Sequence, residues 1–310
     1  MDTLWSYIAQ RLFHSIFVLI GVSLIVFVTI RLTGDPVAMM MQEGNPSAED
    51  IAEMRRMLDL DKPVPLQYVN FLVKASTGDF GRSFRYRTPA FGLVLHHMPA
   101  TIILTVASMA VAILIAFPAG IIGAVYRGRW LDLGVRIFSL IGISMPNFWL
   151  GIILIIVFGV KLRWLPVSGY DTWRHLLMPS VALGTALSGS LTRALRSSML
   201  EVLSADYVRT ARAKGLREGV VLTTHAMRNA LISVLTILGL QLGLLLGGAV
   251  IIENVFSWPG VGRLVVNSIG VRDYPVVQAS VVLLALILLA ANLLVDLLYT
   301  VVDPRITLSD

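Results

Sequence analysis

The chain has 310 residues, of which 56% are hydrophobic and only 14% are charged, and its formal net charge is +6. This composition excludes an ordinary soluble domain and makes the membrane the expected environment. The sequence contains no cysteine, which excludes a disulfide framework and a thiolate metal site.

Long apolar runs, taken in chain order, predict helices that cross the membrane, because a helix satisfies its own backbone polar groups where lipid cannot. Five runs carry no charged residue apart from His14 in the first, and a sixth is shorter and rich in glycine, serine, threonine and alanine. We therefore predict an all-α polytopic membrane protein with six transmembrane helices. Their expected positions are about 12–30, 98–126, 137–160, 176–195, 230–252 and 274–302.

The first run follows Arg11 and could be mistaken for a secretory signal. It is longer than the apolar part of a usual signal, and no small-residue cleavage site follows it. We interpret it as a retained first transmembrane helix.

The basic residues predict the orientation. With the N-terminus in the cytoplasm, the inner segments hold most of the lysines and arginines outside the long first loop, including seven between Arg193 and Arg228. The short outer loops hold fewer, and a long loop crosses the membrane regardless of its charge. Both termini are therefore expected in the cytoplasm, and topology explains the net positive charge without a nucleic-acid partner.

Residues 31–97, between the first and second predicted helices, are expected to form a large folded external loop, because proline and glycine punctuate a nearly balanced set of charges. Ser47 with Asp50 resembles a capping box, and apolar residues then recur at helical spacing as far as Leu58. This pattern predicts a short amphipathic helix. The loop could be a docking surface for an external partner or a lid packed on the helices, and the sequence favours neither.

Prolines lie inside two predicted transmembrane helices, Pro118 in the second and Pro146 in the third. Each removes a backbone donor and can kink a helix. Bent helices occur in transporters, and equally in static packing. Pro146 and the adjacent Asn147 are therefore candidates for a translocation path.

The fifth predicted helix carries Gly239, Gly243 and Gly247 on one face, and Gln241 is a lone polar residue within it. Small faces let helices approach closely in lipid. Static packing explains the glycines, and an interhelical hydrogen bond explains Gln241, more readily than a moving gate or a substrate contact. Gly243 and Gln241 are kept as further candidates for the path.

The usual signs of ion coupling and of catalysis are missing. Asp296 and Glu253 fall near the ends of predicted helices, and no chain of carboxylates crosses the membrane, which disfavours an ion-coupled secondary transporter. No zinc-protease, serine-hydrolase or P-loop motif is present. The chain is not expected to be an enzyme, and if ATP powers transport, the ATPase must be another chain.

The segment 199–229 is the most basic part of this hydrophobic chain. Residues 199–215 fit a helix that Ser204 or Asp206 could cap where it restarts, and Gly215 fits the left-handed position after its end. Anionic lipid headgroups would explain the arginines. They would not explain the small residues Ala211, Ala213 and Gly215, which suit entry into a groove of another protein.

The sequence DYVRTARAKG (206–215) resembles the cytoplasmic coupling loop of ABC importer permeases of the peptide, opine and nickel uptake branch. Further stretches resemble the same branch over most of the chain. They are GDP (34–36), GDFGRS (78–83), SMPNFWLG (144–151), WLPVSG (164–169), FSWPGVGRL (256–264) and RDYP (272–275).

This resemblance implies a type I ABC importer permease in a bacterial or archaeal inner membrane. It implies a first helix and external loop in 1–97, a transmembrane domain in 98–303 and a cytoplasmic tail in 304–310. The implied partners are a second, related permease forming a heterodimer, two ATP-binding subunits that carry ATP and magnesium, and an external substrate-binding protein. Di- or oligopeptides are the expected cargo, with glutathione, opines and nickel chelates as alternatives. The residues expected to couple to the ATPase are Tyr207, Arg209, Thr210, Ala211, Arg212, Lys214 and Gly215.

Overall fold

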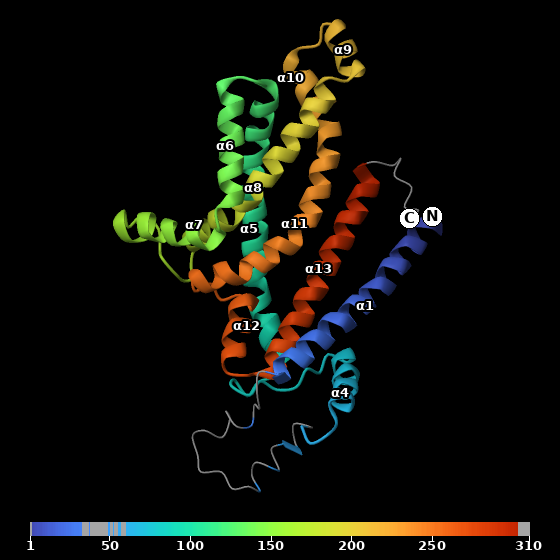
Figure 1. Cartoon of the computed structure of the whole chain (residues 1–310), viewed down its shortest axis with the longest axis vertical. Helices are drawn as coiled ribbons and strands as arrows, with labels where there is room; N and C mark the ends of the chain where they lie inside the picture. The colour runs from blue at the N-terminus through green and yellow to red at the C-terminus, as the bar shows by residue number, and fades with distance from the viewer. Residues whose placement is uncertain are drawn as a thin grey trace. The chain divides into compact units, whose positions relative to one another are not determined.

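A computed structural model of the chain describes residues 2–32 and 60–302 and, between them, the isolated positions 37, 49, 52, 55 and 56. In this part the named elements are all helical (Figure 1). One isolated β-bridge joins Arg82 and Pro89. Three features expected from the sequence lie wholly or largely outside the described residues. They are the amphipathic helix near 47–58, the GDP stretch 34–36 and the tail 304–310.

The helices, in chain order, are α1 (Asp2–Leu32), α4 (Val64–Ser76), α5 (Ala90–Val125), α6 (Trp130–Ser144), α7 (Asn147–Leu154), the π-helix η1 (Ile155–Lys161), α8 (Trp173–Leu203), α9 (Asp206–Ala213), α10 (Glu218–Val220), the π-helix η2 (Val221–Ala226), α11 (Met227–Val255), α12 (Val261–Gly270) and α13 (Tyr274–Val302).

Four segments among the described residues are long and apolar enough to cross a membrane: Tyr7–Leu32, Ala90–Val125, Val234–Val255 and Tyr274–Val295. They fall where the first, second, fifth and sixth transmembrane helices are expected. A fifth crossing is formed if α6 and the α7–η1 segment count as one broken span. The structure therefore has four or five such spans by length and composition.

The third predicted helix, 137–160, is not continuous. It begins earlier, at Trp130, and the chain bends by 99° between α6 and the α7–η1 segment. Met145 is extended, with φ −87° and ψ 123°, as expected before a proline, whose ring disfavours the helical region for its predecessor. Pro146 thus separates two helices, whereas Pro118 lies within the unbroken 36-residue α5.

The fourth predicted helix, 176–195, is observed as the longer helix α8, but its small and polar residues keep it outside the set of clearly apolar spans. α8 is covered by protein along much of its length. A Cβ at Gly184 would lie 2.5 Å from the carbonyl oxygen of Ser108, and a Cβ at Gly189 would lie 2.6 Å from that of Ser139. Because glycine allows this approach to α5 and α6, the polar composition of α8 is compatible with the membrane interior.

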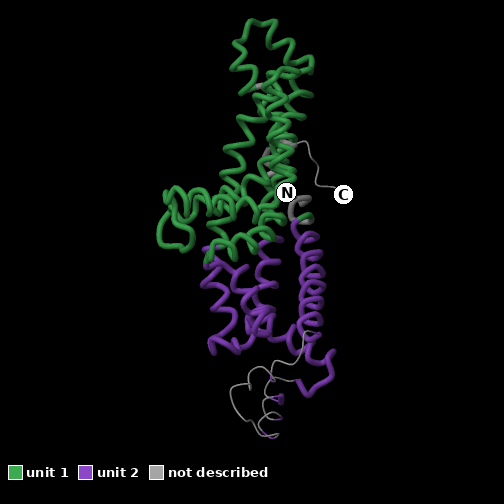
Figure 2. Tube along the Cα trace, turned by 60° about the vertical axis from the view of Figure 1, so that its left-hand side comes forward, with its two compact units in different colours: residues 1–7, 101–258, 290–310 green, residues 8–100, 259–289 purple. Residues whose placement is uncertain are grey.

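The chain forms two compact units (Figure 2). The first comprises residues 1–7, 101–258 and 290–310, and the second comprises residues 8–100 and 259–289. The second unit has its own apolar core, in which Phe80, Val94, Val265 and Val276 are buried.

Part of the long first loop packs on α1 within the second unit. The Tyr68 hydroxyl of α4 donates to the Ile20 carbonyl at 2.9 Å, and Arg31 Nε donates to Gln67 Oε1 at 2.9 Å. Phe27 contacts the Tyr68 ring edge to face. α4 is therefore packed against α1, whereas the predicted helix near 47–58, for which the docking surface and the lid were the alternatives, lies largely outside the described residues.

Candidate functional site

Within the basic segment 199–229, short helices that include α9 and α10 form a loop between α8 and α11 (Figure 1). α8 ends at Leu203, and the extended backbone of Ala205 separates it from α9. Gly215 follows α9 with φ +75°, which confirms the left-handed position expected after the helix. Neither Ser204 nor Asp206 caps α9 with its side chain, because the N-cap residue is Ala205.

One face of α9 is turned into the loop. Val208, Ala211 and Val221 form a buried cluster against Val202 and Leu203, and Ala211 is only 6% exposed. The small size of Ala211 is thus explained by packing inside this chain. Gly215 is explained by its backbone conformation, since a Cβ there would meet no atom within 4 Å. Ala211 is therefore buried within the loop, whereas Gly215 remains exposed.

The opposite face of α9 is exposed, and it carries Tyr207, Arg209, Thr210, Ala213 and Lys214. The Tyr207 hydroxyl accepts a hydrogen bond from Asn229 Nδ2 at 2.7 Å, which fixes the ring relative to α11. Arg209 lies 3.4 Å from Asp206, and both side chains are largely in solvent, so this pair holds Arg209 only weakly. Ala213 is the small residue that faces outward.

Arg212 is committed to a contact within the loop. Its Nη2 and Nε donate to the two carboxylate oxygens of Glu218 at 2.6 and 3.1 Å, across the Gly215 turn. The hydrogen bond from Arg212 lowers the pKa of Glu218, and the reciprocal bond raises the pKa of Arg212. The pair closes the loop between α9 and α10.

A buried ion pair joins α6 to α8 near the base of the loop. Arg196 Nε and Nη2 donate to the two oxygens of Asp132 at 2.6 and 2.9 Å, and the Gly128 backbone N–H donates to the same carboxylate at 3.0 Å. The Asp132 side chain is 2% exposed. Sequence reasoning missed this clamp, because Asp132 lies between the predicted helices 98–126 and 137–160 and its partner Arg196 is 64 positions further along the chain.

The four path candidates lie at three different places in the first unit. Pro146 and Asn147 begin α7, and Asn147 Nδ2 lies 2.9 Å from where a Cβ of Gly248 would be. Gln241 Nε2 donates to Ser190 Oγ of α8 at 3.3 Å, as a helix-packing role predicts. Gly243 is partly buried in α11.

Glu253, expected near an interface, is fully buried and accepts a hydrogen bond from Thr101 Oγ1 at 2.6 Å. The pair joins α11 to α5 within the first unit. Its carboxylate is therefore held by protein groups and is not presented to water.

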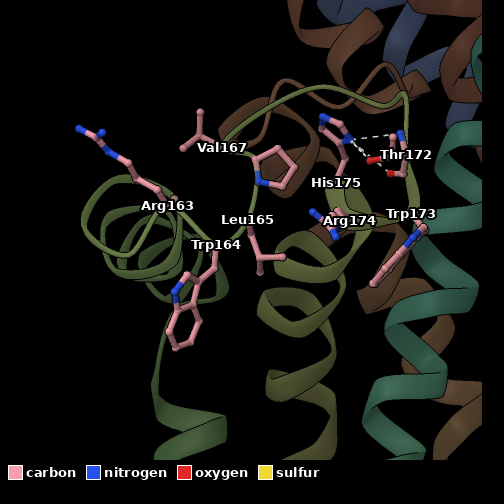
Figure 3. A pocket seen from close by; sticks show the side chains of 10 residues that line it. Arg163, Trp164, Leu165, Val167, Thr172, Trp173, Arg174 and His175 are labelled. Carbon is pink, nitrogen blue, oxygen red and sulfur yellow. Dashed lines mark hydrogen bonds between the residues drawn. The ribbon is translucent and has the colours of Figure 1, made fainter.

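A cavity of about 630 Å³ lies between η1 and the start of α8 (Figure 3). Its lining includes Leu165, Pro166, Arg174 and His175, and none of the four path candidates. His175 Nδ1 interacts with Thr172 at the N-cap of α8, which fixes the ring as part of a capping box. The side chain is thus used to begin the helix.

Residues 116–308 match the protein family described as binding-protein-dependent transport system inner membrane component, and residues 4–105 match the corresponding N-terminal family. The chain belongs to this family of ABC importer permeases. The permease is 43% identical over 302 residues to the glutathione transport system permease protein GsiC of Escherichia coli (strain K12), covering 97% of this chain and 98% of that protein. The GsiC protein of Salmonella typhi is similar to the same extent.

Solved structures agree at the level of the fold. An inward-facing form of the MetNI methionine ABC transporter matches with a TM-score of 0.58 and 19% identity, over 68% of the permease and 96% of that chain. An amino acid ABC transporter matches with a TM-score of 0.51 and 15% identity, over 69% and 94%. The family resemblance is therefore confirmed, and the permease is a multi-pass protein of the inner membrane.

Proposed function

We propose that this permease forms half of a passage for short peptides, paired with a second permease and driven by two ATP-binding subunits on its cytoplasmic side. ATP and magnesium would be bound by those subunits, and an external binding protein would deliver the cargo. The proposal includes six transmembrane helices with both termini in the cytoplasm. α8 then supplies the fourth span, although it is less apolar than the four clear spans, and α6 with α7–η1 supplies one broken span.

The exposed face of α9 is the proposed contact with an ATP-binding subunit. Tyr207, Arg209, Thr210 and Lys214 would touch the partner, and Arg209 is the cation best placed to meet an acidic group there. Arg212, Ala211 and Gly215 would act indirectly, because their contacts and conformation keep the loop in shape.

The observation that carries the proposal is the way the loop is tied to two long helices. The buried cluster of Val208, Ala211 and Val221 reaches Leu203 of α8, and Tyr207 is bonded to Asn229 of α11. A push on α9 would therefore move α8 and α11 together. Such a connection converts closure of an ATPase pair into a change of access across the membrane.

The absence of natural cysteine makes the contact directly testable. An Ala213→Cys variant labelled with benzophenone-maleimide should cross-link to an ATP-binding subunit on illumination of the assembled complex. A Lys161→Cys variant, in the segment assigned to the external side, is the matched control. Cross-linking from Lys161→Cys but not from Ala213→Cys would contradict the proposed contact.

The cargo is proposed as di- or oligopeptides or glutathione, itself a small peptide. The peptide branch of the family supports the first, and the 43% identity to permeases named for glutathione supports the second. The cargoes are ranked by how strongly each unlabelled compound inhibits uptake of a labelled dipeptide. The competitors are oligopeptides, glutathione, opines and nickel chelates. Strong competition by opines or nickel chelates alone would contradict a peptide cargo.

A further inference from the structure

The segment before α5 presents three arginines on one exposed turn. Arg82, Arg85 and Arg87 are all exposed, and none forms an ion pair with an acidic residue in the described part of the chain. We call residues 82–87 the arginine turn.

The backbone of the arginine turn is fixed from several directions. Ser83 N–H donates to the Thr88 carbonyl at 2.8 Å, and Arg87 N–H donates to the Ser83 carbonyl at 3.0 Å. Arg82 Nη2 donates to the Arg87 carbonyl at 3.0 Å. Arg87 itself adopts a left-handed φ of 56°, which a non-glycine residue keeps only where its surroundings hold it.

A carboxylate far along the sequence anchors the same turn. Asp273, between α12 and α13 in the same unit, is fully buried and accepts hydrogen bonds from the Ser83 hydroxyl, from Phe84 N–H at 3.1 Å and from Arg85 N–H at 3.3 Å. The buried carboxylate of Asp273 thus positions the backbone of the turn, while the arginine side chains are exposed to solvent. The turn is a rigid frame that displays positive charge.

The length of α5 sets the arginine turn away from lipid. Thirty-six residues rise about 54 Å, whereas a bilayer with its headgroups is about 40–45 Å thick. The excess lies at the N-terminal end, because the uncharged apolar run begins only at Met98, after His96 and His97. Residues 90–97 rise about 12 Å, which lifts the turn beyond the bilayer core.

The side of the membrane follows from the same helix. The arginine turn directly precedes α5, and Arg127 and Arg129 directly follow it. Segments at the two ends of a spanning helix face opposite compartments. With Arg127 and Arg129 inside, as the distribution of basic residues favours, the turn faces the outside.

We propose that the arginine turn is a docking surface for an acidic patch of the soluble external binding protein. This inference rests on the proposed function and names the place where that partner meets the permease. A guanidinium presents its donors in a planar fork suited to carboxylates, and a turn whose backbone is already fixed loses less freedom when it binds. In the described part of the outer loop, the arginine turn combines a held backbone, exposed positive charge and a position beyond the bilayer core.

Arg85→Glu is the cleanest test, because the Arg85 side chain contacts only the Tyr86 ring, at 5.7 Å, among the contacts described. The complete transporter is placed in nanodiscs, and its Kd for the purified binding protein that supports its uptake is measured at 50 and 500 mM NaCl. Arg85→Glu should raise the Kd about tenfold at low salt, mainly through slower association, and the difference should shrink at high salt. Lys161→Glu makes the same charge change on another exposed segment, and it should leave the Kd within about twofold of the wild type.

An Arg85→Glu Kd within twofold of the wild type at low salt would overturn the docking surface. The measurement is repeated in nanodiscs of zwitterionic lipid alone. An effect that appears only when anionic lipid is present would assign the turn to headgroups and would also overturn the proposal. Wild-type complexes that take up cargo with no binding protein present would contradict the proposed function itself, which keeps the two failures distinct.

Discussion

Neutralising Asp132 probes the clamp between α6 and α8 at the base of the loop. The Asp132 side chain is 2% exposed and receives both hydrogen bonds of the Arg196 guanidinium, which is 20% exposed. Asp132→Asn leaves that guanidinium without its counter-charge. Removing one partner of a fully buried pair costs about 3–5 kcal/mol, and because Arg196 keeps some contact with solvent we expect about 2–3 kcal/mol.

The assay is equilibrium unfolding of the purified permease in detergent, followed by tryptophan fluorescence. Arg136→Gln is the matched control, because Arg136 lies 3.7 Å from Asp132 but is 54% exposed, so its loss should cost less than about 0.5 kcal/mol. The double variant Asp132→Asn with Arg196→Gln should be less destabilised than the sum of the two single variants. The clamp would be refuted if the losses of unfolding free energy of the two single variants simply added in the double variant. It would also be refuted if Asp132→Asn lost no more unfolding free energy than Arg136→Gln.

Three further predictions concern the loop itself. Ala213→Trp, on the exposed face of α9, should lower ATP-driven uptake at least about tenfold by blocking the partner contact, without lowering thermal stability. Ala211→Leu should instead overpack the buried cluster and cost about 1–3 kcal/mol of unfolding free energy. The reverse pattern would show that the faces of α9 are misassigned. Gly215→Ala should cost about 1–2 kcal/mol from its left-handed backbone alone, and an unchanged melting temperature would contradict that conformation. Because the pKa of Glu218 is lowered in the folded state, its pair with Arg212 stabilises the fold above the ordinary pKa of 4.5, and this stability is lost as the pH falls through the lower folded pKa. The melting temperature of Glu218→Gln should therefore lack this acid-dependent loss. Identical pH profiles for the variant and the wild type would count against the pair.

The sequence predicted those parts of the fold that depend on composition. A long apolar helix is stable in lipid whatever packs beside it, so composition alone predicted the helices α1, α5, α11 and α13. The left-handed Gly215 was likewise predictable, because its backbone requirement is local.

Features that depend on neighbours could not be predicted in the same way. Pro118 and Pro146 look alike in sequence, yet only Pro146 divides its helix, because the outcome depends on which surrounding groups satisfy the freed carbonyl. Asp132 and Arg196 are 64 positions apart, and Ser83 and Asp273 are 190 apart, so their pairing is a property of the packed chain.

The loop illustrates both situations within ten residues. The sequence singled out DYVRTARAKG and assigned Ala211 to a partner surface. In the structure, helical phase places Ala211 in the chain's own buried cluster and leaves Ala213 exposed. Distinguishing the two faces of an eight-residue helix required knowing that Val221, ten positions further on, folds back against it.

The central claim is that ATP hydrolysis by partner subunits drives peptide import through this chain, and uptake into proteoliposomes tests it most directly. Vesicles carrying the complete transporter, loaded with ATP and magnesium and given external binding protein, should accumulate a labelled dipeptide or glutathione against its gradient. Accumulation should stop when a non-hydrolysable ATP analogue replaces ATP. Uptake that continues without hydrolysis, or that a proton gradient alone sustains, would contradict the account.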